Sequence, residues 1–375
     1  MKKLLFIENV ATSSATNFYR AALEACKSLG WEFHLAYNCT DYSEEAINEL
    51  EKDLGLSFHQ IDFHRNPLHP GNIKAYGQLC DLVEKEKYDL IHCNTPTGGV
   101  LGRIVASKYR VKPVIYQVHG FHFYKGAPFL NWAIYYPIEK IFARFTDVII
   151  TINKDDYIFA QNHIHPRSRI LYVPGVGIEL NKWESRREIR QEIGLSDDDF
   201  VILVVGRLEK NKDCKTVIKA VSKIKEDKMK LVFCGDGEDR EMLQRTAKKM
   251  GVYERTYFLG NRADMSDIYH MSDVYVLASL REGLSRSIME AMVCGLPCVV
   301  TNIRGNRDLI DYKGGGLFNP KDSNSLMEKI KELFNSNQLR IRAKTYNQDK
   351  IRQFSLDKVI KEIIQIYEVY EENGE

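Results

Sequence analysis

One stretch near residue 280 constrains the fold more than any other part of the sequence. Residues 274–278 are apolar and typical of a buried strand, which ends in a Glu-Gly turn. Ser285 or Ser287 can then begin a helix, and Gly295 is the kind of residue that ends one. Residues 298–301 are again apolar and predict a second strand. Two buried strands joined by one helix form a parallel β-α-β unit, so we expect an α/β protein with a ligand-binding turn at the carboxyl end of the first strand.

Two carboxylates frame this helix, Glu282 before it and Glu290 inside it. Eight helical steps of about 1.5 Å would separate them by roughly 12 Å. Because the two carboxyl groups of a glycoside hydrolase are only roughly 5–9.5 Å apart, we expect these two to hold opposite ends of one long ligand. Between them lie the backbone N–H groups of residues 283–287 and the positive end of the helix, which attract an anion. This order matches the sugar, diphosphate and ribose of a nucleotide sugar.

The same stretch resembles the signature of a known enzyme family. Seven residues separate Glu282 from Glu290, and a Gly-Leu-Pro turn at 295–297, a valine-rich strand and the segment 305–310 follow. This order resembles the Glu-x7-Glu motif of the family 4 retaining glycosyltransferases. The resemblance implies the GT-B fold, an α/β architecture in which two Rossmann-like doubly wound domains face each other across a cleft.

The chain is long enough for the two domains that this fold requires. Its 375 residues are 44% apolar and 28% charged, which is ordinary for globular proteins and sufficient for two α/β cores. Apolar strands alternate with helical segments from the first residues onward, which is the pattern of a doubly wound sheet. By resemblance, residues 1–174 form an acceptor-binding domain and residues 178–352 form a donor-binding domain. A helix at about 355–371 then crosses back onto the first domain.

Charge, cysteines and hydropathy argue against several other classes of protein. A net charge of +2 disfavours a general nucleic-acid-binding protein. The eight cysteines are scattered without a Cys-x-x-Cys pair, which favours reduced core thiols in a cytosolic protein over zinc or disulfides. No run of about 18 apolar residues occurs, so we expect no membrane span. The short apolar run before Glu8 fits a first strand better than a signal peptide.

A second distinctive stretch, residues 113–128, predicts a site on the acceptor side. A strand runs into His119-Gly120, which places the imidazole at the carboxyl end of that strand. A lone histidine is more often a core residue, but this position, and the resemblance to the histidine with which the family contacts the transferred sugar, favour a catalytic role for His119. The spacing of His119 and His122 suits neither one strand face nor a helical metal pair. Further acceptor candidates are Ser13, Ser14, Thr16, His122 and Lys125.

These acceptor candidates have simpler alternatives. The family's loop at the position of residues 9–16 usually carries glycines, whereas this loop offers hydroxyl groups that also suit turns and helix caps. Lys125 is a candidate contact for an acceptor phosphate, and otherwise an ordinary solvated lysine.

The second half of the chain carries a predicted diphosphate clamp. Residues 206–212 follow a strand and resemble the family's Gly-Arg…Lys segment. Arg207 can pair with phosphate oxygens in a bidentate manner and Lys212 adds a point charge, so the two cations can neutralise a leaving diphosphate without a metal. The run Asp197 to Asp199 precedes a strand instead of following one, and we interpret it as a solvated loop. The resemblance implies the rest of the donor site. Glu282 acts as a catalytic residue on the sugar, and the backbone of Gly283, Leu284 and Ser285 binds the diphosphate. Glu290 binds the ribose, and Asn261 and Arg262 lie near the base.

The segment 129–145 is unusually rich in aromatic and basic residues. It is a candidate for contact with an anionic bilayer interface, and the alternative is a core helix with aromatic packing. Residues 119–128 resemble the enzymes of exopolysaccharide and capsule assembly. That resemblance implies a polyprenyl-diphosphate-linked acceptor and a cytoplasmic protein attached peripherally to the inner face of the plasma membrane. The candidate interfacial residues are Trp132, Tyr135, Tyr136, Lys140 and Arg144.

The predicted reaction is glycosyl transfer with retention at the anomeric carbon. The resemblance implies a hexose or N-acetylhexosamine carried on UDP, a lipid-linked saccharide acceptor, and neither a cofactor nor a metal. Within enzymes, a nonhydrolysing epimerase lacks this signature, and a phosphorylase needs a pyridoxal-phosphate lysine that the sequence does not reveal. The remaining alternatives are a soluble acceptor and a sugar-nucleotide-binding protein without transferase activity.

Overall fold

The chain divides into two compact units. The structure is a computed structural model, and it describes residues 1–9, 16–40, 42–67, 69–164, 169–185 and 187–369. Unit 1 consists of Met1–Gly177 together with Leu356–Glu375, and unit 2 consists of Ile178–Ser355. These limits differ by a few residues from those expected from the sequence.

Unit 1 is built on a seven-stranded parallel sheet in the order β3-β2-β1-β4-β5-β6-β7. Phe6 of β1, an inner strand, pairs with Leu35 of β2 on one side and with His92 of β4 on the other. Every residue of β4 and β5 is buried, as expected for parallel strands that are covered on both faces, and the buried residues include the polar side chains of His92, Asn94 and Gln117. The strands are β1 (Lys3–Ile7), β2 (Glu32–Tyr37), β3 (Ser57–Gln60), β4 (Leu90–Asn94), β5 (Val114–Val118), β6 (Val148–Thr151) and β7 (Arg169–Tyr172).

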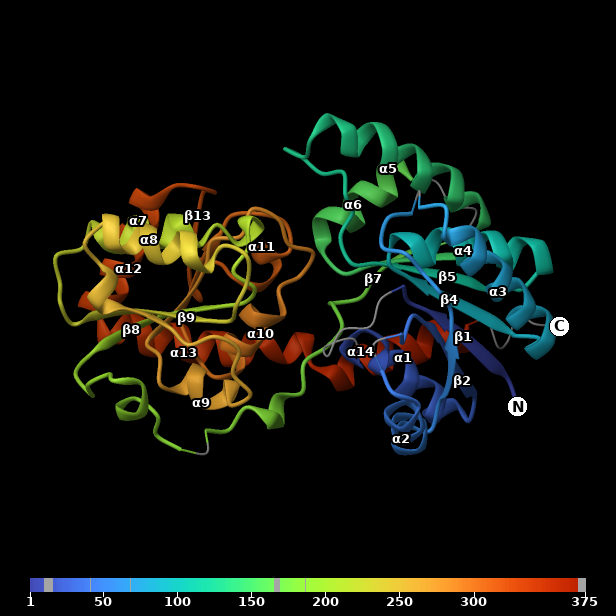
Figure 1. Cartoon of the computed structure of the whole chain (residues 1–375), viewed down its shortest axis with the longest axis horizontal. Coiled ribbons are helices and arrows are strands. Elements are labelled where there is room, and N and C mark those ends of the chain that lie inside the picture. The colour runs from blue at the N-terminus through green and yellow to red at the C-terminus, as the bar shows by residue number, and fades with distance from the viewer. Residues whose placement is uncertain (10–15, 41, 68, 165–168, 186, 370–375) are drawn as a thin grey trace. The chain divides into compact units, whose positions relative to one another are not determined.

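Helices cover both faces of this sheet (Figure 1). Leu4 and Phe6 pack with α1 and α14 on one face, and Leu5 and Ile7 pack with α3 and α4 on the other. The alternation follows from the two-residue period of a strand. The helices are α1 (Thr16–Leu29), α2 (Glu44–Leu54), α3 (Asn72–Glu86), α4 (Pro96–Tyr109), α5 (Phe129–Phe142), α6 (Lys154–His163) and α14 (Leu356–Glu368).

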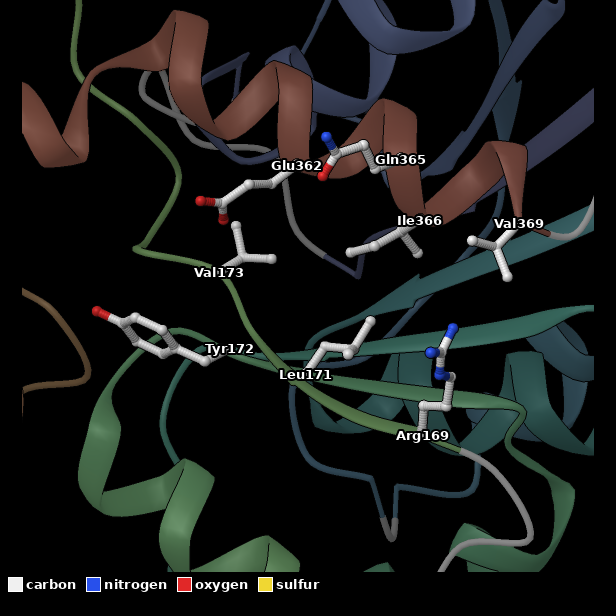
Figure 2. Close-up of a pocket in the computed structure, with 8 residues that line it drawn as sticks. All are labelled: Arg169, Leu171, Tyr172, Val173, Glu362, Gln365, Ile366 and Val369. Carbon is white, nitrogen blue, oxygen red and sulfur yellow. The ribbon is translucent and has the colours of Figure 1, made fainter.

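The last helix, α14, is fixed to unit 1 near its end. The hydroxyl of Tyr367 lies 2.8 Å from Nδ1 of His92 in β4, and its ring stacks on Trp31. Between α14 and the edge strand β7 lies a cavity of about 250 Å³. Figure 2 shows apolar side chains reaching into it from the strand and from the helix. It is lined by Arg169, Leu171, Tyr172, Val173, Glu362, Gln365, Ile366 and Val369, a set that contains none of the predicted site residues.

Unit 2 is built on a six-stranded parallel sheet in the order β10-β9-β8-β11-β12-β13. Its strands are β8 (Phe200–Val205), β9 (Met229–Cys234), β10 (Thr256–Phe258), β11 (Val274–Leu277), β12 (Cys298–Thr301) and β13 (Gly315–Phe318). Its helices are α7 (Cys214–Ser222), α8 (Arg240–Lys249), α9 (Met265–His270), α10 (Arg286–Val293), α11 (Asn306–Leu309), α12 (Ser323–Asn335) and α13 (Asn337–Lys350). Short 3-10 helices of the chain lie at Ala143–Phe145, Leu180–Lys182, Gln191–Ile193, Lys210–Lys212, Tyr253–Arg255 and Ile351–Phe354.

The β-α-β unit predicted around residue 280 is confirmed. β11 and β12 pair in parallel, with Val276 opposite Val299, and α10 connects them. Gly295 follows the helix with a φ of 79°, a left-handed conformation that favours glycine at a helix end.

The six strands of unit 2 follow the same order as the first six strands of unit 1, and this order locates the candidate sites. In each sheet the first three strands run in order from an inner strand (β1 or β8) to one edge, and the fourth strand (β4 or β11) then lies on the other side of that inner strand. The reversal falls between β1 and β4 in unit 1 and between β8 and β11 in unit 2. In open α/β sheets, the loops at the carboxyl ends of the strands at such a reversal bind ligands. The prediction of two Rossmann-like domains is confirmed.

The cysteines form no disulfides in the structure, and its helices are relevant to the prediction of no membrane span. All eight cysteines are buried and free of disulfides. Burial raises the pKa of Cys214 to about 12, so this thiol stays protonated and acts as a packing group. Among the described residues, no helix is both long and apolar enough to cross a membrane.

Candidate active site

The loops after β8 and β11 meet at the strand reversal of unit 2. Lys212 Nζ donates to Glu282 Oε1 at 2.7 Å, although 70 residues separate them in sequence. Two further hydrogen bonds join the loops: the N–H of Leu280 donates to the carbonyl of Asn211 at 2.8 Å, and Asn211 Nδ2 donates to the carbonyl of Arg281 at 3.0 Å. The structure therefore brings together two residues that the sequence predicted separately.

The ion pair between Lys212 and Glu282 lies mostly out of solvent. Their side chains are 19% and 14% exposed, so the attraction is screened less than in a surface pair. Arg207 belongs to the same loop but is 66% exposed, with its Nε 3.8 Å from Glu209. This end of unit 2 thus presents one largely buried cation, Lys212, and one exposed cation, Arg207, beside a positioned carboxylate.

The start of α10 continues the site. Gly283, Leu284 and Ser285 precede the helix, and no side chain of the described residues caps it. Instead, Ser285 Oγ lies 3.1 Å from Ser287 Oγ, which accepts a hydrogen bond from Tyr275 at 2.7 Å. The first N–H groups of α10 therefore lack side-chain acceptors, which suits an anionic ligand.

A glycine in a neighbouring loop supports this segment. Gly305 has a φ of 74°, and a Cβ there would collide with the carbonyl of Gly283. The loop after β12 can therefore pack against the Glu-Gly turn only with glycine at this position.

Glu290 is held inside α10 by two donors. Its Oε2 accepts a hydrogen bond from the hydroxyl of Tyr269 at 2.8 Å, and its Oε1 accepts one from Arg286 Nε at 3.0 Å. Burial raises the pKa of Glu290, while Arg286 and Tyr269 oppose the shift. Neither partner stood out in the sequence, because a helix tyrosine and an i, i+4 arginine are common. The carboxylate is thus a fixed acceptor, suited to the hydroxyl groups of a ribose.

The two residues expected near the base lie in the loop after β10. Asn261 is exposed. Arg262 donates to both oxygens of Asp264, at 2.8 and 2.6 Å, and to Glu192 at 3.2 Å. The hydrogen bond from Arg262 lowers the pKa of Asp264 to about 2. The Nε and Nη2 groups of Arg262 are therefore already occupied within unit 2.

In unit 1, His119 directly follows β5, as the sequence predicted. Its Nε2 lies 2.6 Å from Asn94 Oδ1, and the ring of Phe18 meets it edge-on at 4.8 Å. Burial lowers the pKa of His119 to about 4, so the ring is neutral at physiological pH. Its Nδ1 is buried and has no hydrogen-bond partner among the described residues. Such a ring can accept a hydrogen bond from a sugar hydroxyl.

The other described acceptor candidates of unit 1 lie after β5 and at the start of α1. His122 stacks on Tyr135 with ring centroids 4.5 Å apart, which ties it to α5. Lys125 is exposed, and Thr16 is the first residue of α1. Ser13 and Ser14 lie outside the described residues.

One residue of the acidic run before β8 is largely shielded from solvent and paired, although the sequence suggested a solvated loop. The prediction of a solvated loop is wrong for Asp199, whose side chain is 10% exposed and lies 3.7 Å from Lys230. Its Oδ2 also accepts the N–H of Ser196 at 2.8 Å. The described part of the chain contains no group of three or more His, Cys, Asp or Glu side chains that could hold a metal ion.

The aromatic segment of α5 divides between core and surface. Trp132, Tyr135 and Tyr136 pack on the core of unit 1, and Trp132 Nε1 donates to the carbonyl of Tyr124 at 3.3 Å. Of the two alternatives left open by the sequence, the core alternative holds for these three rings, because they pack against His122, Phe123 and Phe159 of α6. A different set forms an exposed stripe at helical spacing, the α5 stripe: Phe129, Leu130, Ala133, Pro137, Ile141 and Phe145, flanked by Lys140 and Arg144.

Comparison with known proteins defines the family. The profile of the group 1 glycosyl transferases matches residues 185–350, and that of the glycosyl transferase 4-like domain matches residues 15–175. EpsD of Bacillus subtilis, a candidate glycosyltransferase, is 32% identical over 98% of this chain and 97% of its own. An Escherichia coli UDP-Gal:α-D-GlcNAc-diphosphoundecaprenol α-1,3-galactosyltransferase is 30% identical over 88% of this chain and 85% of its own.

A solved structure agrees in fold. Anabaena HepE in complex with UDP superposes with a TM-score of 0.79 at 19% identity, covering 98% of this chain and 100% of that chain. Two Rossmann-like units, with the Glu-x7-Glu motif at the strand reversal of the second, define a glycosyltransferase of the GT-B class. The chain belongs to the family 4 glycosyltransferases.

Proposed function

We propose that this glycosyltransferase moves a hexose or N-acetylhexosamine from UDP to a lipid-linked saccharide, with retention at the anomeric carbon and without a metal. One observation carries the proposal. The contact between Lys212 and Glu282 places a cation and a carboxylate beside the uncapped start of α10, at the strand reversal of unit 2. A carboxylate for sugar hydroxyl groups and a cation for a diphosphate are the two functions that a nucleotide-sugar site needs.

The proposed reaction is a front-side displacement. The bond between the anomeric carbon and the diphosphate oxygen breaks, and the acceptor hydroxyl oxygen bonds to the same face of that carbon. The acceptor proton passes to the departing diphosphate oxygen, so no protein base is required. Arg207, Lys212 and the N–H groups of residues 283–285 stabilise the charge that develops on the diphosphate. Glu282 and His119 are assigned to the sugar.

The remaining donor contacts follow from the same assignment. Glu290 accepts from the ribose hydroxyl groups, and Asn261 and Arg262 lie toward the base. UDP is favoured because the E. coli relative is named for a UDP-sugar and HepE was solved with UDP.

The proposed acceptor is a saccharide on a polyprenyl diphosphate, in the assembly of a surface polysaccharide. The E. coli relative is named for a diphosphoundecaprenol acceptor. A Campylobacter jejuni relative, 24% identical over 96% of this chain, is named for a similar one. His122, Lys125, Thr16, Ser13 and Ser14 remain acceptor candidates. A soluble acceptor is the alternative.

An acceptor of this kind requires access to the membrane surface. The α5 stripe provides exposed apolar side chains beside Lys140 and Arg144. Apolar burial combined with attraction to anionic headgroups supports reversible peripheral binding. We therefore assign the protein to the cytoplasmic face of the plasma membrane.

The test is turnover with UDP-, GDP- and ADP-sugars, with and without a polyprenyl-diphosphate-linked saccharide. We expect acceptor-dependent release of UDP, a product that keeps the donor's anomeric configuration, and a rate that EDTA leaves largely intact. Inversion at the anomeric carbon, or a rate that depends on added Mn²⁺, would contradict the proposed mechanism. UDP binding without turnover on any acceptor would indicate a binding protein.

Variants test the clamp in the same assay. Arg207→Ala and Lys212→Ala should each lower kcat by roughly 10²-fold, because each removes one stabilising charge from the departing diphosphate. Lys210→Ala is the matched control, since Lys210 is an exposed lysine of the same loop. Full activity in both clamp variants would remove the diphosphate assignment.

A further inference from the structure

The strand reversal of unit 1 carries a buried polar cluster that the proposed reaction does not yet explain. Glu8 follows β1 and Asn94 ends β4, the two strands that flank the reversal, and His119 follows the adjacent β5. Glu8 is 3% exposed and Asn94 is fully buried. Three atoms of this cluster, Glu8 Oε2, Asn94 Nδ2 and His119 Nδ1, are buried without a hydrogen-bond partner in the described part of the chain.

The backbone holds Asn94 in place with local strain. Asn94 pairs with Gln117 of β5, so its Cα is fixed by the sheet. The next residue, Thr95, has a φ of 62° and a ψ of 158°. A positive φ is unfavourable for a β-branched residue, and Pro96 restricts Thr95 to an extended ψ. Strained residues of this kind persist at functional sites, where the surroundings fix a side chain in one direction.

The hydrogen bond that Asn94 Oδ1 accepts specifies which nitrogen of His119 carries the proton. Oδ1 of a carboxamide can only accept, so the 2.6 Å contact requires the hydrogen to be on His119 Nε2. In a neutral imidazole the other nitrogen then bears a lone pair. Nδ1 is therefore the acceptor, and it is the atom without a partner among the described residues.

We propose that Asn94 is a positioning residue, which fixes His119 as the Nε2–H tautomer so that Nδ1 accepts a hydrogen bond from a hydroxyl group of the transferred sugar. The proposal rests on the proposed function, because it assumes that His119 meets the sugar. It adds that His119 acts as a neutral acceptor and that Asn94 is needed for this role. No motif marked Asn94, since the residue lies at the end of a short buried strand.

The pH dependence caused by other titratable groups on this face of the sheet has to be distinguished from that of His119. His92, two residues before Asn94 in β4, is buried, and burial lowers its pKa to about 3. Glu8 comes after Ile7, which pairs with Cys93, so the register places it beside Asn94. Burial raises the pKa of Glu8 to about 8, so it titrates in the range of an activity assay. The pH profiles are therefore measured in the Glu8→Gln background.

Two variants of Asn94 test the proposal in the transferase assay. Asn94→Leu removes the acceptor and should lower kcat by about tenfold, the effect of one neutral hydrogen bond, with little change in the donor KM. Asn94→Asp keeps an acceptor but adds a negative charge, which raises the pKa of His119. An imidazolium cannot accept, so kcat of this variant should fall at low pH and recover as the ring deprotonates, whereas the parent profile stays flat between pH 6 and 8.

Controls separate positioning from general damage. Gln117→Leu removes a buried amide from the neighbouring strand and should keep kcat within about twofold of the parent. UDP affinity should be unchanged in every variant, because the UDP-site residues belong to unit 2. Equal losses in Asn94→Leu and Gln117→Leu, or an Asn94→Asp rate that rises as pH falls, would overturn the proposal.

A measurement on the unaltered protein keeps the inference testable if the variants fail to fold. The ¹⁵N NMR shifts of His119 distinguish the two neutral tautomers, and we expect a protonated Nε2 and an unprotonated Nδ1. The opposite tautomer would overturn the proposal whatever the activity. If the expected tautomer is found but no sugar nucleotide is turned over, the proposed function has failed and the arrangement of Asn94 and His119 stands.

Discussion

At the scale of single residues, Glu8 shows how burial links a site to stability. Its pKa is raised to about 8 in the folded chain, whereas a glutamate in an unfolded chain ionises at about 4.3. Between these pH values the folded state keeps a proton that the unfolded state has lost. The free energy of unfolding therefore falls as pH rises through this window, and the loss amounts to about 3–4 kcal/mol at pH 7.

Replacing this carboxyl group should remove the loss. Glu8→Gln is expected to raise the free energy of unfolding at pH 7–8 and to change it little at pH 4, as measured by urea unfolding across that range. Glu86→Gln is a control whose effect on stability should have the opposite sign, because the hydrogen bond from Lys3 lowers the pKa of Glu86. That control should lose stability at neutral pH and match the parent in acid. A Glu8→Gln effect independent of pH would mean that Glu8 is ionised in the folded protein.

At the scale of elements, α5 has one face in the core and one face in solvent. Phe129, Leu130 and Ile141 are 86%, 65% and 54% exposed. The opposite face is anchored by a buried ion pair in which Arg103 Nη1 lies 3.0 Å from Glu139 Oε2. The helix is therefore held on the sheet independently of its exposed stripe, which allows the stripe to be altered without unfolding unit 1.

Changing the stripe should weaken membrane binding alone. Leu130→Ser with Ile141→Ser is expected to lower sedimentation with anionic vesicles and to leave UDP binding unchanged, because it removes only apolar surface. The matched control is Ile73→Ser with Ile341→Ser, two isoleucines that are 76% and 56% exposed on other helices. Binding of the parent should weaken as salt rises. Equal losses in both double variants, or no vesicle binding by the parent, would contradict the assigned surface.

Strand patterns made the fold predictable, whereas helix propensity did not suffice for α4. β11, α10 and β12 follow from apolar runs bounded by glycine and proline. α4 begins with Pro96 and contains Gly98, Gly99 and Gly102, which disfavour a helix in isolation. A Cβ at Gly99 or Gly102 would collide with the Tyr116 ring or with Cys93 Sγ. Tertiary packing thus requires the residues that local propensity disfavours.

The sequence predicted only those residues of the candidate site that belong to a recognisable motif. Lys212 and Glu282 were identified separately, but their contact depends on β8 lying beside β11, and strand order is not encoded locally. Asn94, Asn211 and Tyr269 were missed, because each is a common residue whose role appears only once the strands and helices are assembled.

At the scale of the whole molecule, the two units have separate cores. The two clusters of unit 1 draw on residues up to Val173 and on α14, and the two clusters of unit 2 draw on residues from Ile178 to Phe354. The candidate groups for the nucleotide, Arg207, Lys212, Glu282 and Glu290, all belong to unit 2. Nucleotide binding should therefore stabilise one unit directly.

This localisation can be measured by hydrogen exchange of the full chain with and without UDP. At a concentration 100 times the Kd, a ligand that binds only the folded state stabilises it by about 2.7 kcal/mol. We expect slower exchange in the strands of unit 2 and in residues 206–212 and 283–293, with little direct change in β1 to β5. GDP and ADP at the same concentration should protect less, and Lys212→Ala should reduce the protection by UDP. Protection centred on unit 1, or equal protection by the three nucleotides, would contradict the assignment of unit 2 as the UDP-sugar site.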